Sequence, residues 1–230
     1  MAGKTIAIND SGFKGYLAVP GKENNGQGVL LIQEIFGVNS HIRECADLYS
    51  ELGYTVLAPD VFWRMEPGIQ LGYGPEDMNK GISLMTKLDH EQTVGDLQTA
   101  IGKLKENMSG EAHVAAAGYC MGGFLSYLLA TANAVNAAVC YYGGGIAQHL
   151  DRVSKLNVPI LFHFGKKDAH ITMDQVDSIA KAVAPKNDAQ VFVYEADHGF
   201  NCDQRGTYDR HSAMLAFGRT AAFLQKNLLK

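Results

Sequence analysis

Short apolar segments alternate along the chain with longer segments whose apolar residues recur at helical spacing. Apolar runs without polar alternation are typical of strands in a parallel sheet, because both faces of such a sheet are covered. The sequence predicts strands of this kind at 28–33, 54–59, 113–118, 137–142, 158–164 and 190–195. The longer segments between them predict helices at 40–52, 75–87, 91–107, 121–131, 173–184 and 206–228.

The N-terminal region has a different pattern. Segments 5–8 and 14–19 are split by the turn residues Asp10, Ser11 and Gly12, which predicts an antiparallel hairpin at one edge of the sheet. The first long helix has Asn39 or Ser40 as its N-cap and a glycine, Gly53, just past its end. The regular alternation of strands and helices predicts one α/β domain over 1–230, a doubly wound and mostly parallel sheet with helices on both faces.

Composition and charge narrow the classes of partner. Hydrophobic residues make up 47% of the chain and charged residues 19%, which predicts an ordered protein with a large core. The net charge of −4, with basic residues scattered along the chain, gives no expectation of a nucleic-acid or membrane partner. The first residues lack the apolar run of a signal peptide. The apolar segment 112–142 contains glycines and asparagines and is interpreted as strand, turn, helix and strand.

The cysteines show neither a disulfide framework nor zinc-ligand spacing. They are Cys45, Cys120, Cys140 and Cys202. No two histidines share a ligand spacing with a matching carboxylate. We therefore expect a cytoplasmic protein without metal or cofactor, present as a monomer or a small homo-oligomer.

Reactive side chains follow four of the predicted strands. Glu34 follows 28–33, Cys120 follows 113–118, Asp168 follows 158–164 and His198 follows 190–195. In doubly wound sheets, ligands bind at the carboxyl ends of the strands. The sequence therefore predicts that these side chains share one site.

The segment 117-AGYCMGG-123 matches the pattern G-x-nucleophile-x-G of a strand-to-helix elbow. Glycines permit the tight turn, and the N-terminus of the following helix favours a thiolate at Cys120. Asp168 follows Cys120 by 48 residues and His198 follows Asp168 by 30, which is the α/β-hydrolase order of nucleophile, acid and histidine. Taken singly, Cys120 has an alternative as a small buried apolar residue, Asp168 as a turn cap and His198 as a surface histidine.

Several segments resemble the dienelactone hydrolase (carboxymethylenebutenolidase) family, the cysteine branch of the α/β-hydrolase fold. The most specific are 33-QEIFGVN-39 and 117-AGYCMGG-123, and others are 42-IRE-44, 53-GYTVLAPD-60, 94-VGDL-97, 141-YYGGG-145, 161-LFHFGKKD-168 and 195-EADHGF-200. The resemblance spans nearly the whole chain. It implies an α/β-hydrolase fold and a lactone or carboxylic ester hydrolase that forms a thioester acyl-enzyme and needs no cofactor.

The resemblance also implies roles for individual residues. Cys120 would be the nucleophile, His198 the general base and acid, Asp168 its orienting partner, and Glu34 an extra carboxylate that helps to take the thiol proton. An alternative for Glu34 is capping or an ion pair with Arg43. By position, the backbone N–H groups of Ile35 and Met121 are the expected oxyanion hole.

The chain departs from the family where the substrate carboxylate is held. The family uses two arginines, whose positions correspond here to Met78 and Cys202, with Arg205, Lys80 and Arg64 as the nearest cations. Arginine binds a carboxylate through two parallel hydrogen bonds that lysine reproduces poorly. We therefore expect a hydrolase whose pocket is less tuned to a small anionic lactone, with a carboxylesterase of broader or neutral-substrate specificity as the alternative.

Aromatic residues are further candidates for the substrate pocket. One is Trp63, which lies in the glycine- and proline-rich segment 61–79. Others are Tyr141 and Tyr142, which end a predicted strand. These residues either line the site or pack against neighbouring elements. Two other classes of function stay open. A thiol-redox protein would use Cys120 but lacks a nearby resolving cysteine, and a noncatalytic binding protein would use the same fold.

Overall fold

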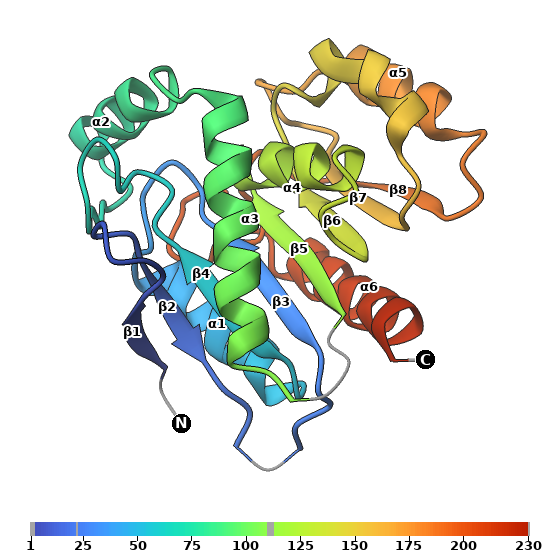
Figure 1. Ribbon diagram of the computed structural model, residues 1–230. Coiled ribbons are helices and arrows are strands. Elements are labelled where there is room, and N and C mark those ends of the chain that lie inside the picture. The colour runs from blue at the N-terminus through green and yellow to red at the C-terminus, as the bar shows by residue number, and fades with distance from the viewer. Residues whose placement is uncertain (1–2, 22, 110–112, 230) are drawn as a thin grey trace. The chain divides into compact units, whose positions relative to one another are not determined.

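The strands and helices of the computed structural model alternate as the hydrophobic pattern predicts (Figure 1). The structure describes residues 3–21, 23–109 and 113–229. Contacts between residues divide the chain into two compact units, 1–114 and 115–230. The prediction of a single domain over 1–230 stays a prediction. None of the helices in the described ranges is long and apolar enough to span a lipid bilayer.

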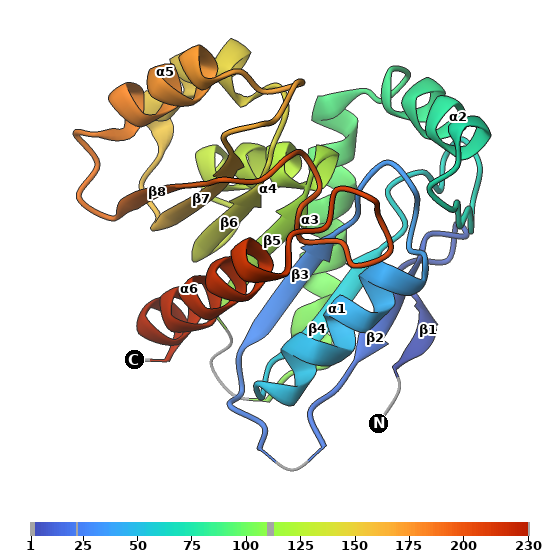
Figure 2. The same ribbon diagram turned by 180° about the vertical axis from the view of Figure 1, so that it is seen from behind.

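The first unit is a sheet with helices on both faces. Its elements are β1 (Lys4–Ala7), β2 (Lys14–Ala18), β3 (Gly28–Ile32), α1 (Ser40–Glu51), β4 (Thr55–Pro59), α2 (Pro75–Met85) and α3 (His90–Glu106). The strand order is β1-β2-β4-β3, with β1 antiparallel to β2, β2 antiparallel to β4, and β3 parallel to β4. The two opposite views show α1 and α3 on opposite faces of these strands (Figures 1 and 2). The antiparallel hairpin that the sequence predicts is therefore confirmed.

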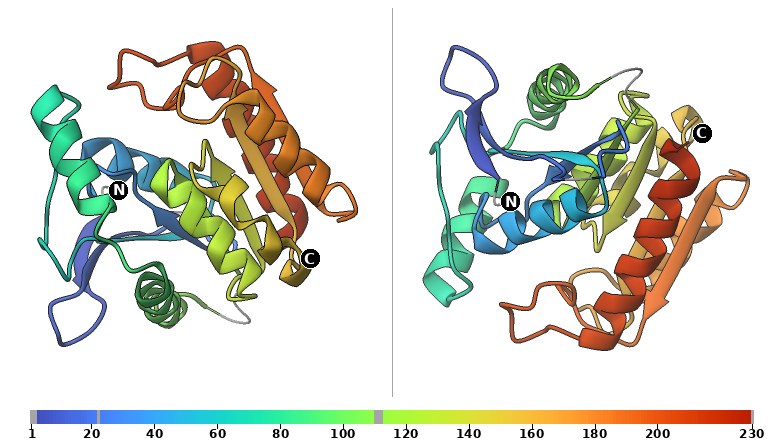
Figure 3. Two further views of the ribbon diagram at one scale, coloured as in Figure 1. Left: turned by 90° about the horizontal axis from the view of Figure 1, so that it is seen from above. Right: turned by 90° about the horizontal axis from the view of Figure 1, so that it is seen from below.

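The second unit is a parallel sheet. Its elements are β5 (Val114–Tyr119), α4 (Met121–Thr131), β6 (Ala137–Tyr141), the 3-10 helix η1 (Ile146–Lys155), β7 (Ile160–Gly165), α5 (Met173–Val183), β8 (Ala189–Tyr194) and α6 (Arg210–Leu228). The strand order is β5-β6-β7-β8, and each neighbouring pair is parallel. Helix α4 packs on β6 with η1 and α5 beside it, and α6 covers the other face of β6 and β7 (Figures 2 and 3). The fold class that the sequence predicts is thus observed within each unit.

Local sequence explains where most helices begin. The Asn39 side chain accepts a hydrogen bond from the backbone N–H of Ile42 at 3.3 Å, which confirms it as the N-cap of α1. Helix α6 begins at Arg210 and not at Gly206, because the Asp209 side chain caps it by accepting from the N–H of Ser212 at 2.8 Å. The 3-10 helix η1 is absent from the sequence-based prediction.

Five fully buried strands supply the core of the two units. All residues of β3, β4, β5, β6 and β7 are buried, whereas β1 and β8 are partly exposed. Burial on both faces explains why the central strands lack polar alternation in the sequence. Because helices cover both faces of the central strands, polar side chains are left to the strand ends.

Candidate active site

Cys120 lies in a sharp turn between β5 and α4. It is the N-cap residue of α4, with φ 54° and ψ −116°, a conformation that residues other than glycine rarely adopt. Its backbone N–H donates to the carbonyl of Tyr141 at 3.0 Å, and its carbonyl accepts from the N–H of Gly123 at 3.0 Å. The neighbouring strand and the first turn of α4 therefore hold the turn from both sides. The cysteine remains partly exposed.

The glycines of the elbow are required by close backbone approach. A Cβ atom on Gly118 would lie 2.1 Å from the carbonyl oxygen of Gly122, and one on Gly123 would lie 2.5 Å from the carbonyl oxygen of Tyr141. Only glycine fits at such distances. The glycine pattern in the sequence thus has the geometric cause expected for a strand-to-helix elbow.

The N-terminus of α4 gives the elbow its electrostatic character. Met121 is the first residue of this helix, so its backbone N–H has no acceptor within the helix. The partial positive charge at a helix N-terminus favours a negative charge beside it. A thiolate at Cys120, or an oxyanion formed next to it, would meet that field.

Asp168 lies in the loop after β7 and uses both carboxylate oxygens. One accepts hydrogen bonds from the backbone N–H groups of His170 and Ile171, at 2.8 and 3.0 Å. The other lies 2.7 Å from Nδ1 of His198. Burial raises the pKa of Asp168, but the hydrogen bond and charge of His198, with the two backbone N–H groups, outweigh burial and lower it below its usual range. Asp168 is therefore held as a carboxylate.

His198 lies in the loop after β8 and joins Asp168 to Cys120. Its imidazole is 2.7 Å from the Asp168 carboxylate and also forms a hydrogen bond with the Cys120 side chain. Burial lowers the pKa of His198, but the charge of Cys120 and the bonds to Asp168 and Cys120 outweigh burial and raise it to about 10. The second unit therefore brings together the cysteine, imidazole and carboxylate that the sequence predicts.

Two aromatic rings lie close to the imidazole of His198. The ring of Tyr142 has its centroid 5.0 Å from that of His198, and the ring of His170 lies 5.3 Å away at 83°. Tyr142 has φ 35°, so the chain is also constrained there. Sequence analysis did not predict that His170 packs against His198, because the local sequence does not indicate which side chain the His170 ring contacts.

Glu34 and Ile35 belong to the first unit, in the turn that follows β3. Both side chains are buried, with Glu34 only 1% exposed. Helix α2 packs closely on this turn, since a Cβ on Gly81 would lie 2.6 Å from the carbonyl oxygen of Ile35. Arg43 lies with its guanidinium 5.7 Å from the ring centroid of Tyr16. The roles assigned to Glu34 and Ile35 stay predictions.

The predicted substrate contacts in the first unit pack against their neighbours. Trp63 stacks on Phe13 with ring centroids 5.0 Å apart, and its indole N–H donates to Asp96 at 3.0 Å. Met78 lies half-buried on α2. The alternative cations form ion pairs: Arg64 with Asp96 at 2.7 Å, and Lys80 with Glu66 at 2.5 Å. Arg205, the third cation, lies in the second unit.

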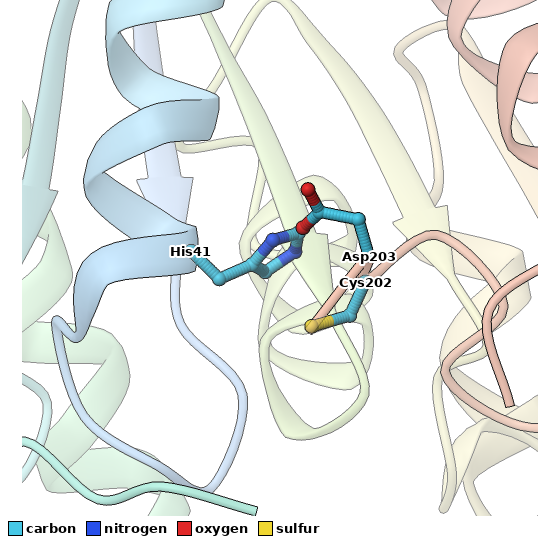
Figure 4. Close-up of side chains that lie close together, drawn as sticks. All are labelled: His41, Cys202 and Asp203. Carbon is cyan, nitrogen blue, oxygen red and sulfur yellow. The ribbon is translucent and has the colours of Figure 1, made fainter. Parts of the chain in front are cut away.

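Arg205 lies in the loop that follows β8, close in space to the residue after His198. A Cβ on Gly199 would lie 2.4 Å from Nη1 of Arg205, so the guanidinium packs on the backbone of Gly199. Cys202, at the position that the resemblance aligns with a substrate-binding arginine, is buried, and Figure 4 shows it beside Asp203 on this loop. The loop therefore brings Arg205 close to the residue after His198, although the resemblance aligns Cys202 and not Arg205 with the family's arginine.

A buried polar network behind the site escaped sequence analysis. His163, on β7, lies 2.8 Å from the hydroxyl of Tyr194 through Nδ1 and 3.0 Å from the hydroxyl of Thr220 through Nε2. Thr220 also lies 2.8 Å from the hydroxyl of Tyr141. Burial and the positive charge of Arg219 lower the pKa of His163 to about 3, which keeps its ring neutral. Tyr141, a predicted substrate contact, thus has its hydroxyl directed to α6.

Comparison with known proteins gives one consistent family. The model of the dienelactone hydrolase family matches residues 13–228. A putative carboxymethylenebutenolidase of Synechocystis is 32% identical over 97% of this chain and 96% of its own length. A carboxymethylenebutenolidase of Pseudomonas putida is 34% identical over 85% of this chain and 84% of its own.

Solved structures agree with the sequence comparison. The crystal structure of a putative dienelactone hydrolase from Klebsiella pneumoniae is 30% identical and has a TM-score of 0.84, covering 97% of this chain and 98% of that one. A dienelactone hydrolase-like promiscuous phosphotriesterase, P91, from metagenomic libraries has a TM-score of 0.78 at 18% identity. The second likeness concerns the fold alone. Together these matches confirm the predicted α/β-hydrolase fold.

Proposed function

Because the chain belongs to the dienelactone hydrolase family, we propose that it hydrolyses a lactone or carboxylic ester with Cys120 as the nucleophile. One observation carries the proposal: Asp168, His198 and Cys120 form a continuous chain of hydrogen bonds that ends at the glycine-rich elbow. Structural cysteines are usually buried and inert, whereas this one is partly exposed at a helix N-terminus beside an imidazole.

The first half of the reaction forms a thioester. The Cys120 thiolate attacks the carbonyl carbon, a carbon–sulfur bond forms, and the carbonyl electrons move to the oxygen. Backbone N–H groups of Met121 and, by the family resemblance, Ile35 stabilise this oxyanion. When the intermediate collapses, the ester C–O bond breaks and the leaving alkoxide takes a proton from the His198 imidazolium. In a lactone the alcohol formed stays attached to the acyl group.

The second half releases the acid. Neutral His198 takes a proton from a water molecule while the water oxygen attacks the thioester carbonyl. The carbon–sulfur bond then breaks, which frees the carboxylic acid and restores the thiolate–imidazolium pair. Asp168 keeps its charge throughout, holds the imidazole in one orientation and stabilises its protonated form.

Glu34 has a gating role in this proposal. A carboxylate near a thiol opposes thiolate formation by like-charge repulsion and can accept the thiol proton. Following the family resemblance, where the Cys120 thiol has kept its proton, Glu34 helps to take it when substrate arrives and passes it to His198, which completes the thiolate–imidazolium pair.

The proposed substrates include neutral esters and lactones beside anionic ones. Methionine and cysteine stand where the family has its two carboxylate-binding arginines, at Met78 and Cys202. Loss of charged hydrogen bonds, worth about 1.5–3 kcal/mol each, weakens a preference for an anionic lactone. Arg205 is the cation that we propose retains part of it, because its guanidinium packs next to the residue after His198.

The nucleophile is tested by replacing one cysteine at a time. Cys120→Ala should abolish turnover of p-nitrophenyl acetate, whereas Cys45→Ala, which removes a buried cysteine on α1, should retain it. Both proteins should keep the far-ultraviolet circular dichroism of the parent. Undiminished hydrolysis by a folded Cys120→Ala protein would overturn the proposal.

A further inference from the structure

The first unit contains a cavity of about 490 Å³ that none of the proposed catalytic residues lines. Three parts of the unit form its wall: the β1–β2 hairpin, the start of α1 and the loop that follows β4. Its polar lining residues are Thr5, Lys14, Tyr16, Arg43, Asp60 and Gln70. Ligand sites for small molecules typically have volumes of roughly 300–1,000 Å³. The cavity therefore has the size of a metabolite site.

Arg43 lines this cavity and has one hydrogen-bond donor that no described residue accepts. Its Nε atom is buried and has no hydrogen-bond partner among the described residues. The guanidinium stands 5.7 Å from the ring centroid of Tyr16, whose hydroxyl is fixed by the Asp47 carboxylate at 2.9 and 3.0 Å. A buried charged donor without an acceptor is costly, and a rotation of this half-buried side chain toward an anion in the cavity would relieve that cost. Arg43 would therefore be stabilised by a hydrogen-bond acceptor that the described residues do not supply.

The carboxylate in the cavity wall is already occupied. One oxygen of Asp60 accepts from the N–H of Phe62 at 3.0 Å and the other from the N–H of Gly68 at 2.6 Å. Burial raises the pKa of Asp60 more than these two bonds lower it. Lys14, an exposed residue of β2, adds a second positive charge. The balance of charge in the cavity therefore favours an anion.

We propose that this cavity binds a small organic anion whose carboxylate or phosphate group is held by Arg43 and Lys14. A planar guanidinium donates two parallel hydrogen bonds to either group, and lysine adds a mobile charge. The apolar lining residues Val38, Pro67 and Ile69 accommodate a short carbon skeleton. This binding site is independent of the proposed reaction at Cys120.

Titrations followed by nuclear magnetic resonance test the site directly. Succinate and inorganic phosphate are added separately at constant ionic strength, and the side-chain Nε–H signal of Arg43 is observed. That signal is assigned by its loss in Arg43→Lys. At least one anion should move it downfield along a saturable curve, and the anion that does so identifies the group recognised. Affinities of the variants are compared through the backbone amide signals of the lining residues Gly15 and Gly68, which every variant retains. Arg43→Gln should weaken binding at least tenfold, while Arg210→Gln, at an exposed arginine on α6, should leave it unchanged.

Two results would overturn this site. One is the absence of a saturable shift with either anion, including shifts that only grow in proportion to concentration. The other is equal affinity in Arg43→Gln and the parent protein. If Arg43→Gln fails to fold, Lys14→Gln replaces it, with a several-fold loss of affinity expected and no loss contradicting the proposal. Because binding and not hydrolysis is measured, the outcome is separate from that of the Cys120 experiment.

Discussion

Asp168 combines two roles that its sequence leaves as alternatives. Turn-like residues around it suggest a cap, and its place after a strand suggests a partner for a histidine. Its two oxygens divide the work, one accepting backbone N–H groups and the other facing His198. The turn thereby fixes the carboxylate, and the carboxylate fixes the imidazole. Orientation of the imidazole is built into the loop and needs no substrate.

The charge of His198 depends on Cys120, which leads to a prediction about pH. Burial alone lowers the pKa of His198, and the attraction of the Cys120 thiolate is the largest of the effects that raise it to about 10. In Cys120→Ala that attraction disappears while burial and Asp168 remain. The pKa of His198, followed by ¹³C or ¹⁵N chemical shifts against pH, should therefore fall well below 10, and the imidazolium should be lost at a lower pH.

Cys45→Ala is the matched control for this titration, since it removes a thiol from a different element. It should leave the pKa of His198 unchanged. An equal pKa in the parent and in Cys120→Ala would show that no thiolate faces the imidazole.

The elbow shows at the scale of elements how glycine positions set the geometry of the site. A Cβ on Gly118 would meet the carbonyl oxygen of Gly122 at 2.1 Å, whereas one on Gly102, in the middle of α3, would meet nothing within 4 Å. Gly118→Ala should lower the free energy of unfolding by about 1–3 kcal/mol or more, because the backbone must move. Gly102→Ala should raise it by about 0.5–1 kcal/mol, because alanine favours a helix.

Urea denaturation of both proteins, with midpoint and slope compared, measures these changes. Similar small effects of the two substitutions would show that β5 and α4 are not packed as closely as the elbow requires.

The network around Thr220 joins β6, β7 and β8 to α6. Thr220→Val keeps the shape of the side chain but leaves His163 and Tyr141 without the hydroxyl that they share. Buried polar groups without partners cost about 1–3 kcal/mol, so the free energy of unfolding should fall by about that amount. Thr220→Ser retains the hydroxyl and should lose less. A Thr220→Val protein as stable as the Thr220→Ser protein would contradict this account of the network.

The elements could be predicted wherever local pattern decides them. The buried runs predict β3 to β7 within two residues at either end, because burial on both faces leaves an unbroken apolar signal. The 3-10 helix η1 could not be found this way. It is interrupted by a kink at His149, which has φ −128° and ψ 31°. The backbone carbonyl of His149 accepts a hydrogen bond from the hydroxyl of Tyr127 at 2.7 Å. That contact arises from packing against α4 and leaves no periodic pattern.

The same distinction holds for the site. Cys120, Asp168 and His198 are visible in the sequence because each follows a strand and parallel strands end at one edge of their sheet. The ring of Tyr142 against His198 and the link from His163 to Thr220 depend on side-chain directions across several elements. The place of Arg205 could not be predicted either, because it depends on how the loop turns toward Gly199 and not on the number of residues between Arg205 and His198.

At the scale of the whole molecule, family membership leaves the choice of substrate open. The family model covers almost all of the chain, yet by the family resemblance Met78 and Cys202 are expected at the positions of its two substrate-binding arginines. We predict specificity constants of similar size for cis-dienelactone and a neutral aryl ester. Arg205→Gln should lower kcat/KM at least tenfold for the anionic lactone and leave the neutral ester nearly unchanged, because only the lactone has a carboxylate to pair.

Arg210→Gln provides the control, as it removes the same charge from an exposed position on α6. Steady-state kinetics on both substrates decide the matter. If Arg205→Gln still strongly prefers the lactone, a different cation binds the carboxylate of the lactone. If kcat/KM falls equally for both substrates, Arg205 supports the structure of the loop instead.

The central claim is that the acyl group passes through the sulfur of Cys120. Rapid acid quenching of the protein during turnover of p-nitrophenyl acetate, followed by mass spectrometry of its peptides, tests that claim most directly. We predict an added acetyl group on the peptide that contains Cys120, formed and lost at rates compatible with turnover and absent from Cys120→Ala. Acetylation confined to other residues, with steady hydrolysis and an unmodified Cys120, would contradict the account.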